Sequence, residues 1–380
     1  MKVCLKATAI LLMVAVLFSC VLFKRAECIS TSAKSFVVMN ADTFDVLAFS
    51  NAHQKMSMAS TTKLMTALIL AEQNTPERTV VTAREMVTVE GSSMGLKIGD
   101  TVSYYDLMVG MLLPSGNDAA NTAAISVAGS IEKFAVLMNK KASEIGMENT
   151  NFVTPSGLDA DGHYSTAYDM ALLASYALKN DIIRDICSKE KITVTFGNPP
   201  YQRTLYNHNK LLGRYDGCIG MKTGFTKKSG RCLVSAAEKN GCRVVAVTLN
   251  DPDDWDDHER LLDFGFSCIE TVDITEDNTV ISVDVVGGTK DKLSLGSPRC
   301  TIGGSKDLAN KVTVNHKIKP FLYAPIKAGE TVGITEYYYN GRLLRETEIF
   351  ALESVDKAVY NESFSQKFIK NFKTIFKQFV

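Results

Sequence analysis

The chain has 380 residues, of which 46% are hydrophobic and 22% charged, with 42 basic and 42 acidic side chains. This amount of apolar material is enough for a folded core and excludes a chain that is disordered throughout. A formal net charge of zero argues against nucleic acid as the main partner. At roughly 150 residues per domain, the length predicts about two domains with appendages.

The N-terminal segment has the pattern of a secretory signal. Two lysines precede an apolar run at 7–23, and small residues follow at Ala26 and Cys28. A basic region, an apolar stretch and a small-residue cleavage point are typical of a signal peptide, so we expect residues 1–28 to be removed and the rest exported. The alternative is an uncleaved anchor helix, because the run is close to the length that spans a membrane. A lipoprotein cleavage site at Cys20 fits poorly, since apolar residues follow it.

The cysteine pattern gives no indication of a metal site. No CxxC pair and no Cys/His cluster with zinc spacing occurs beyond the signal, so we predict no metal and no cofactor. Disulfides can form in an exported protein, but spacing does not decide their pairing. The cysteines concerned are Cys187, Cys218, Cys232, Cys242, Cys268 and Cys300.

Residues 29–270 predict an α/β domain with one sheet flanked by helices. The segment 35–51 predicts a β-hairpin with its turn at 41–42. From Ser60 to about Glu72, apolar residues recur every three and four positions, which predicts a helix with one apolar face. The remaining elements are expected as helices at 104–113, 118–129, 131–145, 167–178 and 255–266, and as strands at 218–222, 230–237 and 243–249.

Residues 271–355 consist of short β-rich runs separated by turns, and they predict a small all-β domain without a catalytic cluster. Asn340-Gly341, between two β-rich runs, is a strong hairpin signal. Strands are expected at 279–286, 311–318, 331–339 and 342–350.

The last stretch, 356–380, predicts an amphipathic helix. Aromatic residues form one face, lysines project from the other, and no acid follows Glu362. Such a helix is suited to a membrane interface. The alternative is a helix docked on the core of the protein itself.

A serine and a lysine open the first amphipathic helix. A spacing of three places Ser60 and Lys63 on one helical face, so that the amine can reach the hydroxyl. Serine is a weak nucleophile until a base takes its proton, and a lysine can be that base only when burial or other cations favour its neutral form. The same spacing recurs at Ser188 and Lys191, but without a comparable apolar helix, so an isolated match carries little weight.

Two further motifs accompany this pair. Ser115 and Asn117 put a hydroxyl and an amide on a tight connection before a helix, where the structural alternative is that one of them caps the helix. Lys222, Thr223 and Gly224 end an apolar strand and offer a positive charge, a hydroxyl and a position open to close backbone approach. An ordinary strand end is the structural alternative.

In this order, the three motifs resemble the signature of the penicillin-recognising serine enzymes. The resemblance covers about residues 33–355 and is closest to the low-molecular-mass penicillin-binding proteins that act as D-alanyl-D-alanine carboxypeptidases. It implies a β-lactamase/transpeptidase-like α/β domain, a small β domain and an amphipathic tail. The segment 249–258 resembles a branch found in spore-forming bacteria. Further supporting stretches are 58–67, 90–94, 155–158 and 163–167.

The resemblance implies catalytic roles for four residues. Ser60 attacks the peptide carbonyl between two D-alanines and forms an acyl-enzyme, and Lys63 acts as the general base. Ser115 relays a proton to the leaving amine. The backbone N–H groups of Ser60 and Phe225 form the oxyanion hole.

The resemblance also implies how the substrate is held. Asn117 bonds the substrate backbone, Lys222 and Thr223 hold the terminal carboxylate, and Gly224 allows the substrate to approach. The implied partners are peptidoglycan stem peptides ending in D-Ala-D-Ala, β-lactams as covalent inhibitors, and a membrane surface contacted through 356–380. The implied location is the outer face of the cell membrane and the cell wall.

Some relatives carry an arginine downstream of Lys-Thr-Gly that helps to hold the carboxylate, whereas this chain has the acidic run 253–257 there. The acidic cluster at 251–258 fits no EF-hand spacing, so we predict a solvated turn leading into a helix rather than a calcium site. For His163 we predict a structural hydrogen bond, because a Ser–Lys pair needs no histidine.

Three other functions remain open at this point. A β-lactamase shares the motifs, but no glutamate motif for rapid deacylation is found between Asn117 and Lys222. A D,D-endopeptidase or transpeptidase differs only in leaving group or acceptor. A catalytically silent wall-binding protein would share the fold with these enzymes but not their activity.

Overall fold

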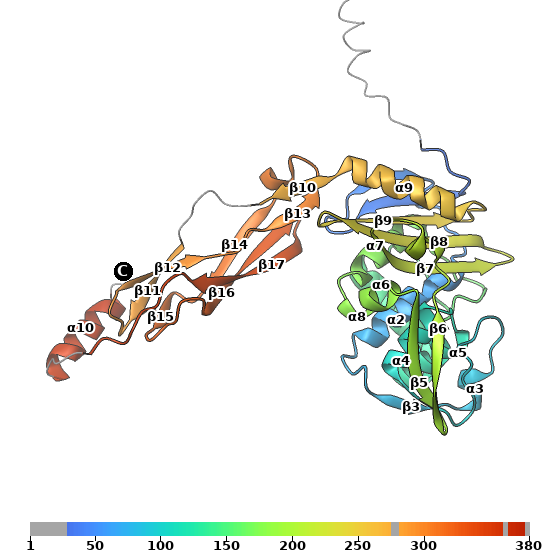
Figure 1. Ribbon diagram of the computed structural model, residues 1–380, viewed down its shortest axis with the longest axis horizontal. Coiled ribbons are helices and arrows are strands. Elements are labelled where there is room, and N and C mark those ends of the chain that lie inside the picture. The colour runs from blue at the N-terminus through green and yellow to red at the C-terminus, as the bar shows by residue number, and fades with distance from the viewer. Residues whose placement is uncertain (1–28, 275–280, 360–363, 377–380) are drawn as a thin grey trace, which may run out of the picture.

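The structure is a computed structural model, and it describes residues 29–274, 281–359 and 364–376 (Figure 1). The predicted signal peptide, 1–28, lies outside the described residues. The elements form a helix-flanked sheet, a separate β-rich part and a C-terminal helix.

The central sheet of the first part is antiparallel and five-stranded. Its order is β2 (Val46–Ser50), β1 (Ser35–Asn40), β9 (Cys242–Leu249), β8 (Gly230–Lys239) and β7 (Cys218–Thr226). The predicted hairpin is confirmed, since β1 pairs with β2, and β1 also pairs with β9 from the far end of this part. Because β7 is the last strand, one of its sides is free of strand partners.

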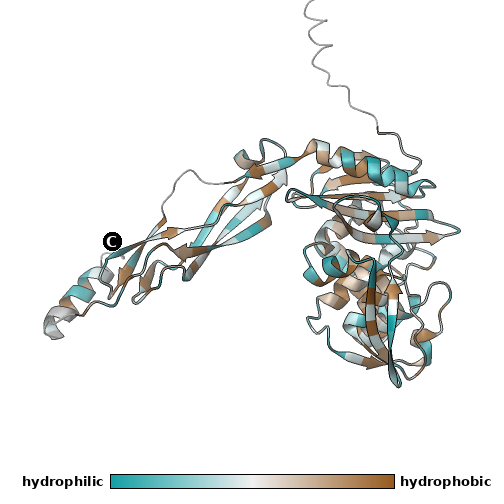
Figure 2. Ribbon diagram, in the orientation of Figure 1, coloured by the Kyte–Doolittle hydropathy of each residue, from teal (hydrophilic) through white to brown (hydrophobic). Residues whose placement is uncertain are grey.

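Both faces of this sheet are covered by helices. Val37 and Met39 pack with the helical side, whereas Phe36 and Val38 pack with Leu261 of α9 (Asp254–Cys268) on the other. This alternation follows the period of two of a β-strand. The first half of α9 is largely hydrophilic, while apolar residues gather on the helices beneath the sheet (Figure 2). The helical side contains α4 (Tyr104–Leu112), α5 (Asn117–Ala128), α6 (Ile131–Ile145), α7 (Ala167–Ala177) and α8 (Asp181–Cys187).

The helix predicted at 60–72 differs from expectation in one respect. A 3₁₀ turn, η1 (Ala59–Thr62), precedes α2 (Lys63–Ala71), and every residue of α2 is buried. The prediction of a single apolar face was therefore wrong. The reason is packing, because α2 contacts α4, α5, α6, α7 and α8 and has no solvent side.

The prediction of one sheet in this part was also incomplete. A second sheet has the order β3 (Thr79–Val81), β4 (Thr101–Ser103), β5 (Lys191–Gly197) and β6 (Pro200–Tyr206). The alternation of Ile192, Val194 and Phe196 in β5 was overlooked. The strand β6 is mostly exposed, and β3 and β4 have only three residues each, too few for an apolar periodicity. The short elements α3 (Arg84–Val87) and η2 (Lys210–Gly213) were missed for the same reason.

The C-terminal β domain has a six-stranded sheet and a two-stranded sheet. Asn340 and Gly341 have φ angles of 50° and 74° in the hairpin between β16 (Thr331–Tyr339) and β17 (Arg342–Ala351), as Asn-Gly turns require. The larger sheet also contains β14 (Thr313–Ile318), β12 (Lys292–Gly296), β11 (Ile281–Val286) and β15 (Phe321–Tyr323). The smaller one pairs β10 (Glu270–Asp273) with β13 (Thr301–Gly304), and η3 (Leu308–Asn310) follows.

The C-terminal helix α10 (Phe364–Phe376) lies at the far end of the β domain from the first part (Figure 1). Its Phe368, Ile369 and Phe372 side chains are 63%, 56% and 53% exposed. Among the described residues, no helix combines the length and the apolar character needed to cross a membrane.

Candidate active site

Ser60 lies in η1, between the free side of β7 and the helical side of the sheet. The preceding residue, Ala59, has a φ of 48°, a left-handed conformation that L-residues adopt only when the surrounding structure imposes it. In the first turn of a helix the N–H groups have no intrahelical acceptor, so the Ser60 N–H is available to a ligand.

Lys63 meets three oxygens. Its Nζ lies 2.8 Å from Ser60 Oγ, 2.7 Å from Asn117 Oδ1 and 2.6 Å from the Ser156 carbonyl oxygen. An ammonium donates to all three. A neutral amine donates to Asn117 and to the Ser156 carbonyl, and its lone pair then accepts the Ser60 hydroxyl proton. The spacing of three therefore brings the Ser60 and Lys63 side chains together, as predicted.

The surroundings of Lys63 favour the neutral amine. Its side chain is fully buried. Burial, followed by the positive charge of Lys222, holds the pKa of Lys63 well below its ordinary value, while Asp118 acts in the opposite direction. A lysine with a lowered pKa can act as a general base near neutral pH.

Ser115 and Asn117 lie at the start of α5, where Asn117 contacts Lys63. Ser115 is buried and has a φ of 64°. Asn117 accepts from Lys63 through Oδ1 and donates through Nδ2 to the Glu90 carbonyl at 2.7 Å. The N-cap of α5 is Gly116, without a side-chain cap, so the alternative that Ser115 or Asn117 caps this helix is wrong.

Asp118 is a site residue that the sequence reasoning missed. It is fully buried, and its carboxylate accepts from the backbone N–H groups of Met94, Gly95 and Leu96 at 2.9, 3.0 and 2.9 Å. These bonds hold the segment 92–96 against α5. The only sequence signal was an acid in the first turn of a helix, which is too common to single out.

The strand β7 forms the opposite wall. Lys222 is 1% exposed and donates to the Thr223 carbonyl at 2.8 Å, and burial lowers the pKa of Lys222 to about 7. A Cβ on Gly224 would lie 3.0 Å from the Ser60 nitrogen and 3.1 Å from the Thr61 nitrogen. Gly224 therefore allows the close approach of η1, the turn that carries Ser60, whereas the sequence analysis had assigned this close approach to the substrate.

These walls enclose a cleft of about 550 Å³. Lys63, Asn117 and Lys222 lie behind its lining, as buried supports of the residues that face it. The lining residues are Ser60, Ser92, Ser115, Asn207, His208, Lys210, Thr223, Gly224, Phe225, Arg231, Asp254 and Trp255.

Two other candidates from the sequence, His163 and the second Ser-x-x-Lys sequence at 188–191, have structural roles. His163 accepts from the Val153 N–H at Nδ1 (2.9 Å), so Nε2 carries the proton that it shares with Thr62 Oγ1 at 3.0 Å. Burial lowers the pKa of His163 to about 4, and the predicted structural role is confirmed. Ser188 donates to the Asp185 carbonyl at 2.8 Å, and Lys191 begins the hairpin strand β5.

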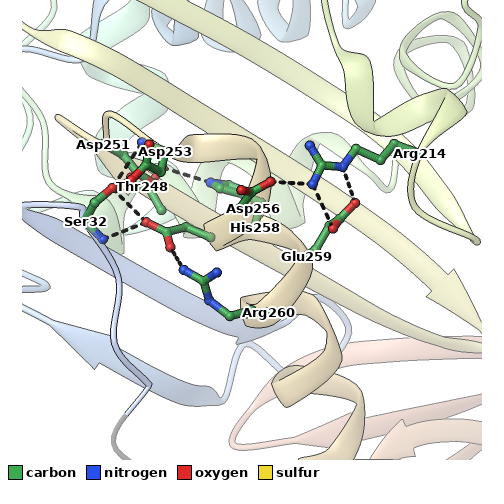
Figure 3. A network of polar contacts seen from close by, with 10 residues as sticks. Ser32, Arg214, Thr248, Asp251, Asp253, Asp256, His258, Glu259 and Arg260 are labelled. Carbon is green, nitrogen blue, oxygen red and sulfur yellow. Dashed lines mark hydrogen bonds and ion pairs between the residues drawn. The ribbon is translucent and has the colours of Figure 1, made fainter.

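The prediction of a solvated acidic turn was wrong for four of its residues, because Asp251, Asp254, Asp257 and His258 are buried. Asp251 accepts from Ser32 Oγ at 2.5 Å (Figure 3). Asp257 accepts from the Ser32 N–H at 2.7 Å. These two carboxylates therefore connect the segment before β1 to the start of α9. Within residues 29–274, 281–359 and 364–376, no three acidic, His or Cys side chains form a group that could hold a metal ion, and the six cysteines are free.

Two family models match this chain. Residues 23–253 match the D-alanyl-D-alanine carboxypeptidase family, and residues 270–357 match the C-terminal domain of penicillin-binding protein 5.

Curated relatives cover most of the chain. It is 33% identical to D-alanyl-D-alanine carboxypeptidase DacF of Bacillus subtilis over 351 residues, 88% of this chain and 89% of the relative. It is 35% identical to DacC of Escherichia coli over 356 residues, 87% and 86% of the two chains.

Solved structures are similar as well. Penicillin binding protein 5 from Haemophilus influenzae superposes with a TM-score of 0.61 and 27% identity, covering 86% of this chain and 98% of that one. The Streptomyces K15 DD-transpeptidase has a TM-score of 0.60 and 30% identity, with 63% and 98% covered.

Proposed function

Because the chain belongs to the D-alanyl-D-alanine carboxypeptidase family, we propose that Ser60 is the nucleophile with which it removes the terminal D-alanine from peptidoglycan stem peptides. The observation that carries this role is the 2.8 Å contact between Ser60 Oγ and the buried Lys63 Nζ. The chain is a serine-type carboxypeptidase, and we assign the remaining parts of the chemistry to Lys63, Ser115 and the strand β7.

Acylation begins when neutral Lys63 takes the proton of Ser60 Oγ. The oxygen attacks the carbonyl carbon of the penultimate D-alanine and forms a tetrahedral intermediate. The N–H groups of Ser60 and Phe225 stabilise its oxyanion, and loss of one such donor typically costs about 10²–10³ in rate. The approach of β7 to η1 at Gly224, which a Cβ would obstruct, supports this pairing of donors.

The proton then goes to the leaving amine. Ser115 lines the cleft with Ser60, so its hydroxyl can pass the proton from Lys63 to the nitrogen of the departing D-alanine. The C–N bond breaks, and the shortened peptide remains as an ester on Ser60. Water, deprotonated by the same lysine, hydrolyses the ester and restores the serine.

Substrate binding involves both walls of the cleft. The Thr223 hydroxyl contacts the terminal carboxylate, and Lys222 adds positive charge from behind the lining, since its amine is bonded to the Thr223 carbonyl. Burial lowers the pKa of Lys222 to about 7, and a substrate carboxylate nearby favours its ammonium form. Asn117 orients Lys63 and has a second Nδ2 N–H for the substrate backbone.

We further propose that residues 1–28 are a signal peptide, that 29–270 form the catalytic domain and that 271–355 form the β domain. Residues 356–380 hold the enzyme at the outer face of the cell membrane. The exposed Phe368, Ile369 and Phe372 support the last point, because a helix docked on the core of the protein would cover them.

Mass spectrometry of the chain from residue 29, incubated with a pentapeptide ending in D-Ala-D-Ala, tests the function. Ser60→Ala removes the nucleophile, and Ser188→Ala is the matched control from the other Ser-x-x-Lys sequence. We expect loss of one alanine by wild type and Ser188→Ala only. An intact peptide with all three proteins contradicts the proposal.

Penicillin separates the alternatives. A lasting adduct on Ser60 together with alanine release supports the carboxypeptidase, and an adduct that turns over rapidly supports a β-lactamase. No adduct supports a silent wall-binding protein. Cleavage of a cross-linked dimer peptide in preference to the pentapeptide supports an endopeptidase.

A further inference from the structure

A second cavity lies at the junction between the first part and the β domain. It has a volume of about 500 Å³, within the roughly 300–1,000 Å³ typical of ligand sites. The strand β8 reaches both places, because Arg231 near its start lines the active cleft and Glu238 near its end lines this cavity. At about 3.3 Å per residue, these two positions are about 23 Å apart. The cavity is therefore separate from the catalytic machinery.

Three arginines from three different elements line this junction cavity. Arg184 comes from α8, Arg243 from β9 and Arg345 from β17. The first two belong to the first part and the third to the β domain, so positive charges face the cavity from both sides of the junction. Like charges that share a cavity repel each other, and an anion placed between them relieves this repulsion.

Two of these arginines have their carboxylate partners within the first part. Arg184 donates to Asp181 Oδ1 at 2.6 Å, but the Asp181 side chain is 85% exposed, and such a surface pair contributes little stability. Arg243 pairs with Asp42, which also lines the cavity. Neither ion pair crosses the junction, so these pairs do not explain why the arginines gather there.

The arginine of the β domain has no carboxylate partner among the residues that the structure describes. Arg345 Nη1 donates to the Thr301 carbonyl at 2.9 Å, and this bond lies within the β domain. The junction itself is bridged by an amide, because Asn40 Nδ2 donates to the Gly303 carbonyl at 2.8 Å. Arg345 is therefore not needed to join the two parts, and it keeps its charge and most of its five N–H donors for a ligand.

The charges around the junction cavity are positive in excess. Its lining contains three arginines but two acids, Asp42 and Glu238. A lysine nearby is affected by the same charges: burial lowers the pKa of Lys179, and Arg243 and Arg342 lower it further, although Asp42 acts in the opposite direction. The cavity is therefore suited to an anionic ligand.

We propose that the junction cavity binds a phosphate group that belongs to a phosphodiester polymer of the cell wall. A phosphate offers more acceptor oxygens than a carboxylate, and guanidinium groups bind it in bidentate fashion. The cavity is far larger than one phosphate needs, since a water molecule takes about 30 Å³, so neighbouring units of a polymer can enter as well. A lipid headgroup fits less well, because α10 lies at the far end of the β domain from this junction (Figure 1). The choice of a wall polymer rests on the proposed function, which places the enzyme at the cell wall with α10 in the membrane surface.

Calorimetry at constant ionic strength measures the binding of a glycerol phosphate oligomer to the chain from residue 29. We expect Arg345→Gln to weaken binding by about 10- to 100-fold, the range for a lost charge-assisted hydrogen bond. Glu238→Gln should tighten binding by about two- to fivefold, because it removes an acid from the lining. Arg299→Gln is the matched control and should stay within twofold of wild type, since Arg299 also belongs to the β domain but does not line the cavity.

Alanine release from the pentapeptide is measured on the same samples. The three variants should release alanine at the wild-type rate, because none of the substituted residues lines the active cleft. Wild type without alanine release refutes the proposed function, whereas the result with the oligomer decides the phosphate site.

Four results would overturn the phosphate site. The first is failure of wild type to bind the oligomer, and the second is equal weakening by Arg345→Gln and Arg299→Gln. The third is binding of an oligoglutamate of the same charge as tightly as the glycerol phosphate oligomer. The fourth is a loss of binding to anionic vesicles, but not to the oligomer, in Arg345→Gln, which would identify a lipid headgroup as the ligand. If Arg345→Gln does not fold, Glu238→Gln decides, and an affinity unchanged from wild type overturns the inference.

Discussion

Gly157 has a larger structural role in the site than its place outside the three motifs suggests. It follows Ser156, whose carbonyl oxygen accepts from Lys63 Nζ at 2.6 Å. Gly157 has a φ of 82°, and a Cβ added there would lie 1.9 Å from the Ala59 carbonyl oxygen. The added methyl group of Gly157→Ala therefore clashes with Ala59, the residue directly before Ser60, although the two segments are almost 100 positions apart in the chain.

The size of the effect follows from these distances. Ordinary contact begins at 3.4 Å, so η1 or the 156–157 segment must move by about 1.5 Å. A misplacement of about 1 Å in reacting groups costs on the order of 100-fold in rate. We expect Gly157→Ala to lower the rate of Ser60 acylation by about 100- to 1,000-fold. The left-handed backbone adds roughly 1–2 kcal/mol of destabilisation.

Gly162→Ala separates the clash from the backbone strain. Gly162 has nearly the same φ, 78°, but its added Cβ would meet nothing closer than Asn151 Nδ2 at 3.6 Å. The assay is the second-order rate of penicillin acylation, followed by mass spectrometry below the melting midpoint of both variants. Acylation by Gly157→Ala within threefold of Gly162→Ala would refute the reasoning.

The remaining predictions concern the base, the acidic run and the tail. Lys63→Arg keeps a cation but removes the proposed general base, so we expect the rate of acylation by penicillin to fall by about 10²–10⁴-fold. Stopped-flow measurements of acylation check this, and an unchanged rate contradicts the role of Lys63 as general base. Burial raises the pKa of Asp251 to about 7, so its contribution to stability is full below about pH 4 and is lost as the pH rises through 7. Denaturant titrations between pH 4.5 and 8 should therefore show this decline in the free energy of unfolding of wild type and not of Asp251→Asn. Replacing Phe368 and Phe372 together by serine should abolish co-sedimentation with anionic vesicles, while replacing Val136, an exposed apolar residue of α6, should leave it intact; equal binding by both variants contradicts the proposed role of the tail.

Local sequence patterns were sufficient for much of this protein. The three-residue spacing of Ser60 and Lys63 is a helical neighbour relation, and it does bring the two side chains to 2.8 Å. The β1–β2 hairpin and the Asn340-Gly341 turn depend on neighbouring residues in the same way. Within a helical turn or a hairpin, the backbone geometry alone decides which side chains meet, so a pattern in the sequence is enough.

Contacts between distant segments were decided only by the tertiary structure. Asn117 and Ser156 reach Lys63 from 54 and 93 positions away, and their approach depends on how α5 and a loop pack around α2. The burial of the acidic run became visible only when Ser32 and Arg231 were placed beside it. A carboxylate that pairs with an arginine and one that faces water are identical in sequence. What distinguishes them is the partner that packing brings within hydrogen-bond distance and the solvent that packing excludes.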